Sequence, residues 1–148
     1  MSEVTTTIHI DAPPERVWVV VMDADRLKDW VTIHRKLNQA PEGPPRRGVA
    51  MVQTLCLRGA SFKVRWTLTD CEAPHHATWQ GRGPARSEAL TEYRLTARDG
   101  GTAFAYRNDF KAPLGPLGAV ASRALVGGIP EREANRSLAR LKELIERR

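Results

Sequence analysis

Apolar residues near the C-terminus of the chain follow the period of an α-helix. They recur at spacings of three and four residues and so share one helical face: Ala134, Leu138, Leu141, Leu144 and Ile145. Acidic residues begin this segment and basic residues end it, which suits the dipole of a helix. The pattern predicts a long amphipathic helix over residues 130–148, whose apolar face needs a surface on which to pack.

The rest of the chain is dominated by the two-residue alternation that is typical of β-strands. Residues 4–10 alternate between apolar and polar side chains, which predicts a half-buried first strand. The chain repeats this alternation after residue 48, in segments separated by turn residues: 49–57, 62–69, 76–82, 87–98 and 102–110. Because short turns such as Asp99-Gly-Gly join these segments, we expect consecutive strands to pair in an antiparallel meander.

Two short helices are predicted between the first strand and the later ones. The sequence Asp-Ala-Pro-Pro-Glu opens the first helix, where we expect Asp11 or a nearby residue to be the cap. Asp23 caps the second helix, in which Leu27 and Trp30 are the buried positions. Residues 31–47 contain three prolines and one glycine, and Gly48 follows them, so we expect an irregular segment, and loops of this length are often functional. A further apolar stripe over residues 117–125 predicts a helix before the final one.

This order of elements indicates an α+β fold in one domain over residues 1–148. We expect an antiparallel, curved sheet of about six strands that wraps on the long C-terminal helix, with the two short helices after the first strand. One helix is only about 10–12 Å across. A wide sheet wrapped on so narrow a helix should therefore leave a cavity at one end.

Charge and composition narrow the class of protein. The formal net charge is +6, but the basic residues look scattered among acidic ones, so a nucleic-acid partner is not favoured. The two cysteines, Cys56 and Cys71, do not suggest a disulfide framework. No apolar run reaches the roughly 20 residues of a membrane span, and the N-terminus has no signal-peptide pattern, so we expect a cytoplasmic protein.

Two stretches of sequence resemble a known superfamily. The opening Ile8-His-Ile-Asp-Ala-Pro-Pro-Glu-Arg-Val-Trp, followed by Asp23-Ala-Asp-Arg-Leu-Lys-Asp-Trp, resembles the start of START-like, or SRPBCC, proteins. The closing helix from Ala134 is similar to theirs. The resemblance implies a helix-grip fold with a lipophilic cavity between sheet and helix. Members include polyketide cyclases and dehydrases, aromatases and coenzyme Q-binding proteins, so the motifs indicate a fold rather than one function.

With this geometry, the inward face of the sheet supplies the candidate ligand-binding residues. They are mostly apolar side chains with a few polar ones among them: Met51, Gln53, Leu55, Phe62, Val64, Trp66, Trp79, Tyr93, Phe104, Tyr106 and Asn108. Buried polar side chains need partners, so the four polar members either bond one another and water or orient a ligand. The indoles can stack on aromatic rings. The set suits an oxygenated polycyclic or quinone-like molecule.

Other residues with reactive side chains are weaker candidates for a functional site. His34 lies in the predicted loop, as a solvated histidine or as a titrating gate residue. Cys71, Glu72, His75 and His76 form the one cluster that resembles metal ligands, but they crowd a single turn, and no metal or cofactor is predicted.

Three functional hypotheses follow. The first is binding of a small lipophilic molecule without chemistry, because the inward face lacks an acid–base pair. The second is a polyketide cyclase, aromatase or dehydratase, with Tyr93, Tyr106 and His34 as candidates, or Arg65 or Arg82 if the strand phase is shifted by one. The third is an interaction protein whose basic surface meets RNA, a ribosome or an acidic partner, and it rests on net charge alone. The ligand, any catalysed reaction and the oligomeric state stay open.

Overall fold

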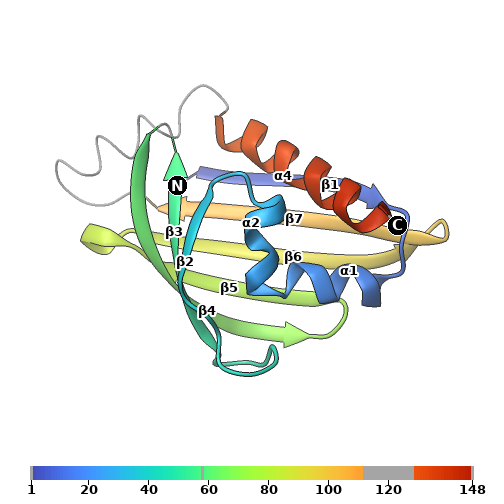
Figure 1. Cartoon of the computed structure of the whole chain (residues 1–148), viewed down its shortest axis with the longest axis horizontal. Helices are drawn as coiled ribbons and strands as arrows, with labels where there is room; N and C mark the ends of the chain where they lie inside the picture. Colours follow the sequence, from blue (N-terminus) through green and yellow to red (C-terminus); the bar gives the residue numbers. More distant parts are fainter. Residues whose placement is uncertain (1, 58, 112–128, 148) are drawn as a thin grey trace.

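The computed structural model describes residues 2–57, 59–111 and 129–147. The described residues form a seven-stranded antiparallel sheet in the order β1-β7-β6-β5-β4-β3-β2 (Figure 1). The strands are β1 (Ser2–Ile10), β2 (His34–Gln39), β3 (Ala50–Leu57), β4 (Ala60–Glu72), β5 (His76–Arg82), β6 (Glu88–Arg98) and β7 (Gly101–Lys111). Apart from the pair β1 and β7, neighbours in the sheet are also neighbours in the sequence, as expected for a meander.

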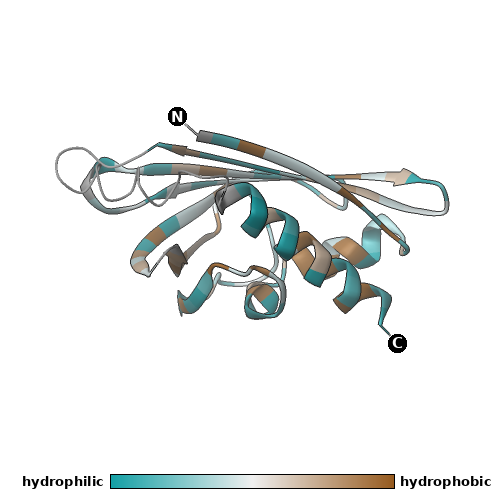
Figure 2. Cartoon of the chain, turned by 90° about the horizontal axis from the view of Figure 1, so that it is seen from above, coloured by the Kyte–Doolittle hydropathy of each residue, from teal (hydrophilic) through white to brown (hydrophobic). Residues whose placement is uncertain are grey.

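Helices cover one side of this sheet and leave the other side open (Figure 2). Their bounds are α1 (Pro14–Val21), α2 (Leu27–Trp30) and α4 (Ile129–Glu146), with short 3₁₀ turns η1 (Ala24–Arg26) and η2 (Pro84–Arg86). The α+β helix-grip fold and the two short helices after the first strand are confirmed. In the described part of the chain, no helix is long and apolar enough to cross a membrane.

The C-terminal helix α4 packs on the sheet through the predicted stripe. Leu138, Leu141 and Ile145 are at most 2% exposed, because they face the core, where α4 contacts β1, α2 and α1. Hydrogen bonds fasten the C-terminal end of α4: Arg16 Nη2 donates to the Ile145 carbonyl at 2.6 Å, and Lys142 Nζ donates to the His9 carbonyl at 2.8 Å. This half of the helix is therefore held tightly against the sheet.

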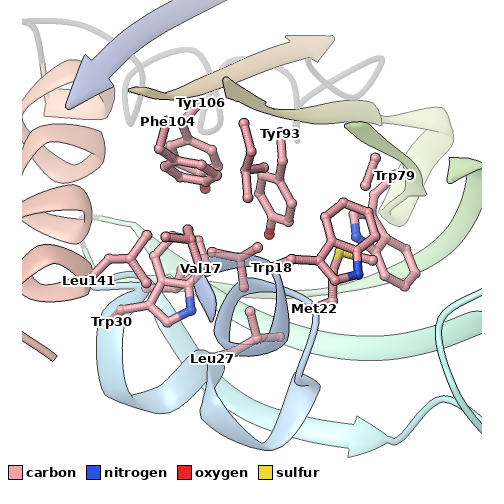
Figure 3. Close-up of a cluster of buried hydrophobic side chains, with 14 of the residues drawn as sticks. Val17, Trp18, Met22, Leu27, Trp30, Trp79, Tyr93, Phe104, Tyr106 and Leu141 are labelled. Carbon is pink, nitrogen blue, oxygen red and sulfur yellow. The ribbon is translucent and has the colours of Figure 1, made fainter. Parts of the chain in front are cut away.

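Four interlocked aromatic rings form the centre of the core (Figure 3). Trp30, from α2, is fully buried, and its ring lies 5.8–6.4 Å, centroid to centroid, from Tyr93, Phe104 and Tyr106 of the sheet. Tilted and edge-to-face contacts of this kind stabilise a core beyond the area that they bury. The short helix α2 is thus anchored by one large side chain, and Asp23 caps η1 before it by accepting from the Asp25 amide.

Two sequence-based expectations need correction. Residues 31–47 are not wholly irregular, because β2 forms within them and brings the sheet to seven strands. This strand lies at the sheet edge, pairs only with β3 and has an irregular register, so its sequence shows no clean alternation. The first helix also begins at Pro14 without a side-chain cap. The predicted helical stripe over 117–125 lies outside the described residues.

A row of charged side chains crosses the outer face of the sheet. His76 Nδ1 lies 2.6 Å from Asp70 Oδ2, and His76 Nε2 lies 2.7 Å from Glu92 Oε2. Arg107 continues the row, with Nε 3.3 Å from Glu92 Oε1 and Nη1 3.6 Å from Glu3 Oε2. The row therefore links β4, β5, β6, β7 and β1, and Glu92 is its central carboxylate.

Replacing this carboxylate should weaken the fold in a pH-dependent way. Burial acts to raise the pKa of Glu92, but the hydrogen bond from His76 and the charges of Arg94 and Arg107 outweigh it and lower the pKa. A lowered carboxyl pKa stabilises the fold above the unfolded value of about 4.3, and this contribution is lost as the pH falls through the folded value. Glu92→Gln should therefore lower the free energy of unfolding by about 1–2 kcal/mol at neutral pH, as measured by urea denaturation.

A second variant, measured over the same range of pH, is the control for Glu92→Gln. Glu143→Gln removes an exposed carboxylate that pairs with Arg147 at 3.2 Å, and such surface pairs contribute about 0–1 kcal/mol. The difference between Glu92→Gln and the parent should shrink as the pH falls below about 4. A difference that stays constant down to strongly acidic pH would contradict the assigned role.

Candidate functional site

A cavity of about 130 Å³ lies between the sheet and the N-terminal half of α4. Its walls come from six strands, from α2 and the segment after it, and from the first turns of α4. The lining residues are Val4, Leu27, Val31, Ile33, Met51, Gln53, Leu55, Phe62, Val64, Trp66, Trp79, Ala89, Thr91, Tyr93, Tyr106, Asn108, Asp109, Phe110, Glu133, Ala134 and Ser137. Most of these side chains are apolar, so the cavity favours an apolar occupant.

The cavity exists because the inward positions of α4 change size along the helix. Ala134 and Ser137 are buried in the first turns, whereas Leu138, Leu141 and Ile145 fill the later ones. Large side chains close the space beneath the C-terminal half, and two small ones leave it open beneath the N-terminal half. The predicted mismatch between a narrow helix and a wide sheet is therefore resolved at one end only.

The structure places all but one of the candidate ligand-binding residues on the cavity wall. The exception is Phe104, which is fully buried and packs behind the tyrosines, with its ring centroid 5.6 Å from that of Tyr93 and 6.3 Å from that of Tyr106. In Figure 3 its ring lies beside Tyr106, above Trp30. Phe104 thus supports the wall from behind rather than lining it.

Sequence reasoning missed the part of the wall that does not come from the middle of the sheet. Leu27, Val31 and Ile33 lie in or after α2, and Glu133 and Ser137 lie on α4. The sequence did carry a signal for the last of these. Ser137 is three residues beyond Ala134, which is the first residue of the predicted stripe, so a small polar position within the stripe could have been included.

The amide of Gln53 is fixed by other protein groups. Trp66 Nε1 donates to Gln53 Oε1 at 2.9 Å, and Gln53 Nε2 lies 2.8 Å from His34 Nδ1. The expected solvated loop histidine is therefore wrong: His34 is half-buried on β2, and burial lowers its pKa. Since an amide nitrogen can only donate, His34 Nδ1 accepts, which places the proton of the neutral ring on Nε2. His34 does not line the cavity.

A glycine opposite Trp66 makes this arrangement possible. Gly81 pairs with Trp66 across β4 and β5, and a Cβ atom at position 81 would lie 2.8 Å from the indole ring and 2.6 Å from Val64 Cγ1. Contacts that short do not occur for real side chains, so only glycine leaves room for the indole at this position. The ring can thus lie on the inner face while its N–H reaches Gln53.

Two tyrosines present their hydroxyls on the inner side of the sheet (Figure 3). Burial raises the pKa of Tyr93 and of Tyr106, so both hydroxyls stay protonated at neutral pH; for Tyr106 a hydrogen bond with Asn108 acts in the opposite direction. Asn108 Oδ1 accepts from Thr91 Oγ1 at 2.7 Å, so the amide is held in place. Among the described residues, the Tyr93 hydroxyl has no hydrogen-bond partner, so it is free to donate to a molecule in the cavity.

The rim at α4 is tied to the segment after α2. The Thr32 amide donates to Ser137 Oγ at 3.0 Å, and the Thr32 hydroxyl donates to the Glu133 carboxylate. Arg136 Nη1 also donates to Glu133, at 3.3 Å. Glu133 is therefore held by two partners at the rim. The cavity as a whole offers neutral hydrogen-bond donors and apolar walls, with carboxylates confined to Glu133 and Asp109 among its described lining.

The remaining candidates lie away from the cavity. Both ring nitrogens of His76 face carboxylates of the outer row, and His75 Nδ1 lies 3.2 Å from the Leu95 carbonyl, so the two histidines do not converge. Across the residues that the structure describes, no group of three or more His, Cys, Asp or Glu is placed to hold a metal ion. Arg65 and Arg82 are exposed on the outer face, so the alternative in which the strand phase is shifted by one is wrong.

Comparison with known proteins identifies relatives over almost the whole chain. A Mycobacterium tuberculosis H37Rv protein named as a toxin is 23% identical over 133 residues, which cover 88% of this chain and 92% of that protein. An uncharacterized protein of the same strain is 25% identical over 131 residues, which cover 87% of this chain and 92% of that protein. At these identities the names say nothing specific about the function of this chain.

Solved structures share the fold. A protein of Thermus thermophilus superposes with a TM-score of 0.78 at 18% identity, over 97% of each chain. The Zhui aromatase/cyclase of Streptomyces sp. R1128 gives a TM-score of 0.76 at 21% identity, over 99% of this chain and 94% of that one. The sequence profile described as "Polyketide cyclase / dehydrase and lipid transport" matches residues 1–146. With the helix-grip fold and its apolar cavity, this match shows that the chain belongs to the polyketide cyclase, dehydrase and lipid transport family of the SRPBCC superfamily.

Proposed function

We propose that this protein binds a small, uncharged, oxygen-bearing aromatic molecule in the cavity between the sheet and α4. The observation that carries the proposal is an apolar cavity whose wall holds the Tyr93 hydroxyl, which has no hydrogen-bond partner among the described residues. Membership of a family of cyclases, dehydrases and lipid transporters supports a ligand-binding or cyclase-type role.

The size of the cavity limits the ligand. Its volume of about 130 Å³ is close to that of an engineered protein cavity of about 150 Å³ that binds benzene. Sites for drug-sized molecules measure about 300–1,000 Å³. A single aromatic or quinone-like ring therefore fits the cavity as it stands, whereas a polycyclic ligand requires part of the wall to move.

The chemistry of the wall sets the preferred substituents. The Tyr93 hydroxyl can donate to a carbonyl or phenol oxygen, and Trp66 and Trp79 offer aromatic faces. The carboxylates of Glu133, at the rim, and of Asp109, elsewhere in the lining, repel an anion. The favoured ligand is thus neutral and carries an oxygen on or next to its ring.

A cyclase, aromatase or dehydratase activity is the second candidate, and the structural likeness to an aromatase/cyclase favours it. Tyr93 would donate to a developing oxyanion in such a reaction. His34 is bound to Gln53 away from the cavity wall, and Glu133 is engaged at the rim. The candidate base is therefore Asp109, whose Oδ1 has no hydrogen-bond partner among the described residues. Pure binding requires no such base and is therefore the simpler assignment. Turnover of a polyketide-like substrate that is lost in Tyr93→Phe would favour the enzyme instead.

The proposed role of Tyr93 can be tested with two probes of similar shape. Acetophenone carries a carbonyl oxygen that ethylbenzene lacks, and both are small single-ring molecules. We expect the parent protein to bind acetophenone about 3–10-fold more tightly than Tyr93→Phe does, because one net hydrogen bond contributes about 0.5–1.5 kcal/mol. Ethylbenzene should bind both proteins equally. Titration followed by the NMR shifts of the tryptophan indoles measures both affinities.

Tyr106→Phe is the matched control for this titration. Its hydroxyl already bonds to Asn108, so its removal should change the preference for acetophenone less than Tyr93→Phe does. Equal losses in the two variants would contradict the assignment of Tyr93 as the anchoring donor. If acetophenone, small quinones and fatty acids all leave the indole resonances unchanged, the binding proposal fails as a whole.

Filling the cavity from the helix should abolish binding without unfolding the protein. Ala134→Leu adds a branched side chain that points from α4 into the cavity, where the small Ala134 side chain leaves space. We expect binding of ethylbenzene to be lost, with a change in unfolding free energy within about 1–2 kcal/mol, because the added atoms occupy existing space. Ala139→Leu, at an exposed position of the same helix, is the control and should leave binding intact. Binding that survives Ala134→Leu would place the ligand elsewhere.

A further inference from the structure

The net positive charge of the chain is confined to one part of the sequence. Residues 34–87 contain nine Lys or Arg and three Asp or Glu, whereas the remaining residues contain fourteen of each. This segment forms β2, β3, β4, β5 and η2, which together make the half of the sheet farthest from β1. Basic residues that look scattered along the chain are therefore gathered by the fold into one half of the sheet.

Four of these cations lie together on the outer face of the sheet, and we call them the basic face: Lys36, Lys63, Arg65 and Arg82. All four side chains are exposed. The strand register brings them together. Lys36 on β2 and Lys63 on β4 both pair with Thr54 of the strand between them, and Arg65 lies directly opposite Arg82.

Among the direct cross-strand neighbours of the basic face, the one carboxylate is Glu88 of β6, which lies opposite Arg82. None of its four side chains forms an ion pair with another described residue, whereas Arg107, on the other half of the sheet, lies 3.3 Å from Glu92. Like charges directly opposite each other on antiparallel strands destabilise the sheet, so the pair Arg65 and Arg82 has an energetic cost. An unbalanced pairing of this kind fits a surface that meets an external anion.

The basic face also lies directly behind the cavity wall. Lys63 follows Phe62, and Arg65 stands between Val64 and Trp66, so the cations alternate along β4 with residues that line the cavity. A partner held on the outer face of these strands is therefore separated from the cavity by the sheet alone. Along β4 the cations and the lining side chains differ only in the face that they occupy.

We propose that the basic face docks the protein on a bilayer surface that contains anionic lipid. Charge complementarity supplies the attraction, and each Lys or Arg next to such a surface contributes about a factor of five in affinity. The proposal extends the proposed function, because a lipophilic ligand dissolves in bilayers and docking brings the cavity close to that source. Docking itself needs no ligand, so the two proposals can fail independently.

Nucleic acid is the competing polyanion for this surface. Proteins that hold single strands stack the bases on aromatic side chains that lie among their cations. In this chain every aromatic residue lies in the described ranges, and each of them either lines the cavity or is buried in the core: Trp18, Trp30, Phe62, Trp66, Trp79, Tyr93, Phe104, Tyr106 and Phe110. The outer face thus offers no stacking platform, and the family description includes lipid transport, so the bilayer is favoured.

Flotation with lipid vesicles tests the docking proposal in the absence of any ligand. The full chain should float with vesicles of phosphatidylcholine and phosphatidylglycerol, and not with vesicles of phosphatidylcholine alone. Added NaCl should release it, because salt screens exposed charges. Lys63→Glu/Arg82→Glu should weaken the association by a factor of about 25 or more, given the contribution of each cation.

The matched control makes the same change in net charge elsewhere. Arg98, at the end of β6, and Arg140, on α4, are both exposed and lie outside the basic face. Arg98→Glu/Arg140→Glu should therefore keep most of the vesicle affinity. The Lys63→Glu/Arg82→Glu variant should unfold at about the same urea concentration as the parent, since it exchanges the like-charge pair of position 82 with Arg65 for one with Glu88. It should still bind acetophenone.

Three outcomes would each overturn the docking proposal in a distinct way, and a fourth would concern the cavity proposal alone. Equal losses in the two double variants would mean that net charge alone drives association. Equal flotation with neutral vesicles would mean that the contact is not electrostatic. Tighter binding to single-stranded RNA than to anionic vesicles, through Lys63 and Arg82, would assign the basic face to nucleic acid. If acetophenone binding fails while docking persists, the fault lies with the cavity proposal.

Discussion

A single helix about 10–12 Å across has to cover the inner face of a seven-stranded sheet, and this constraint shapes the whole molecule. The C-terminal half of α4 meets it with Leu141 and Ile145, which fill the space down to the core. The short helix α2 helps by inserting Trp30 among the aromatic rings of the strands. The N-terminal half of α4 leaves the requirement unmet, and the cavity is the result.

Polar groups inside such a space have to be paired, and the pairing explains much of the detail of the wall. Gln53 is held by Trp66 and His34, and Asn108 is held by Thr91, so these amides are already oriented before any ligand arrives. A preorganised wall loses little freedom on binding, which favours affinity. The network also removes His34 from consideration as a free base. The same hydrogen bonds therefore pair the buried polar groups and hold the cavity wall in a fixed arrangement.

Sequence patterns predicted the parts of the structure that repeat regularly. The alternation along β4 and the stripe of α4 indicated the inner faces correctly, because a buried face has one periodicity. The edge strand β2 was not predicted, because the side chains of a strand with one neighbour and a polar sequence need not alternate. The position of Ser137 on the cavity wall and the hydrogen bond between Gln53 and His34 were also not predicted. These depend on which elements meet in space, and no local pattern contains that information.

The change of side-chain size along α4 has a consequence for how such proteins diversify. The polar groups of the wall lie mostly on the strands, while the space available beneath the helix is set by Ala134 and its neighbours. Capacity and chemical preference are thus encoded in different elements of the chain. Substitutions on one helical face can change the volume of the cavity while the hydrogen-bonding groups of the sheet stay in place. Selectivity in this architecture has two nearly independent controls, and evolution can adjust each of them separately.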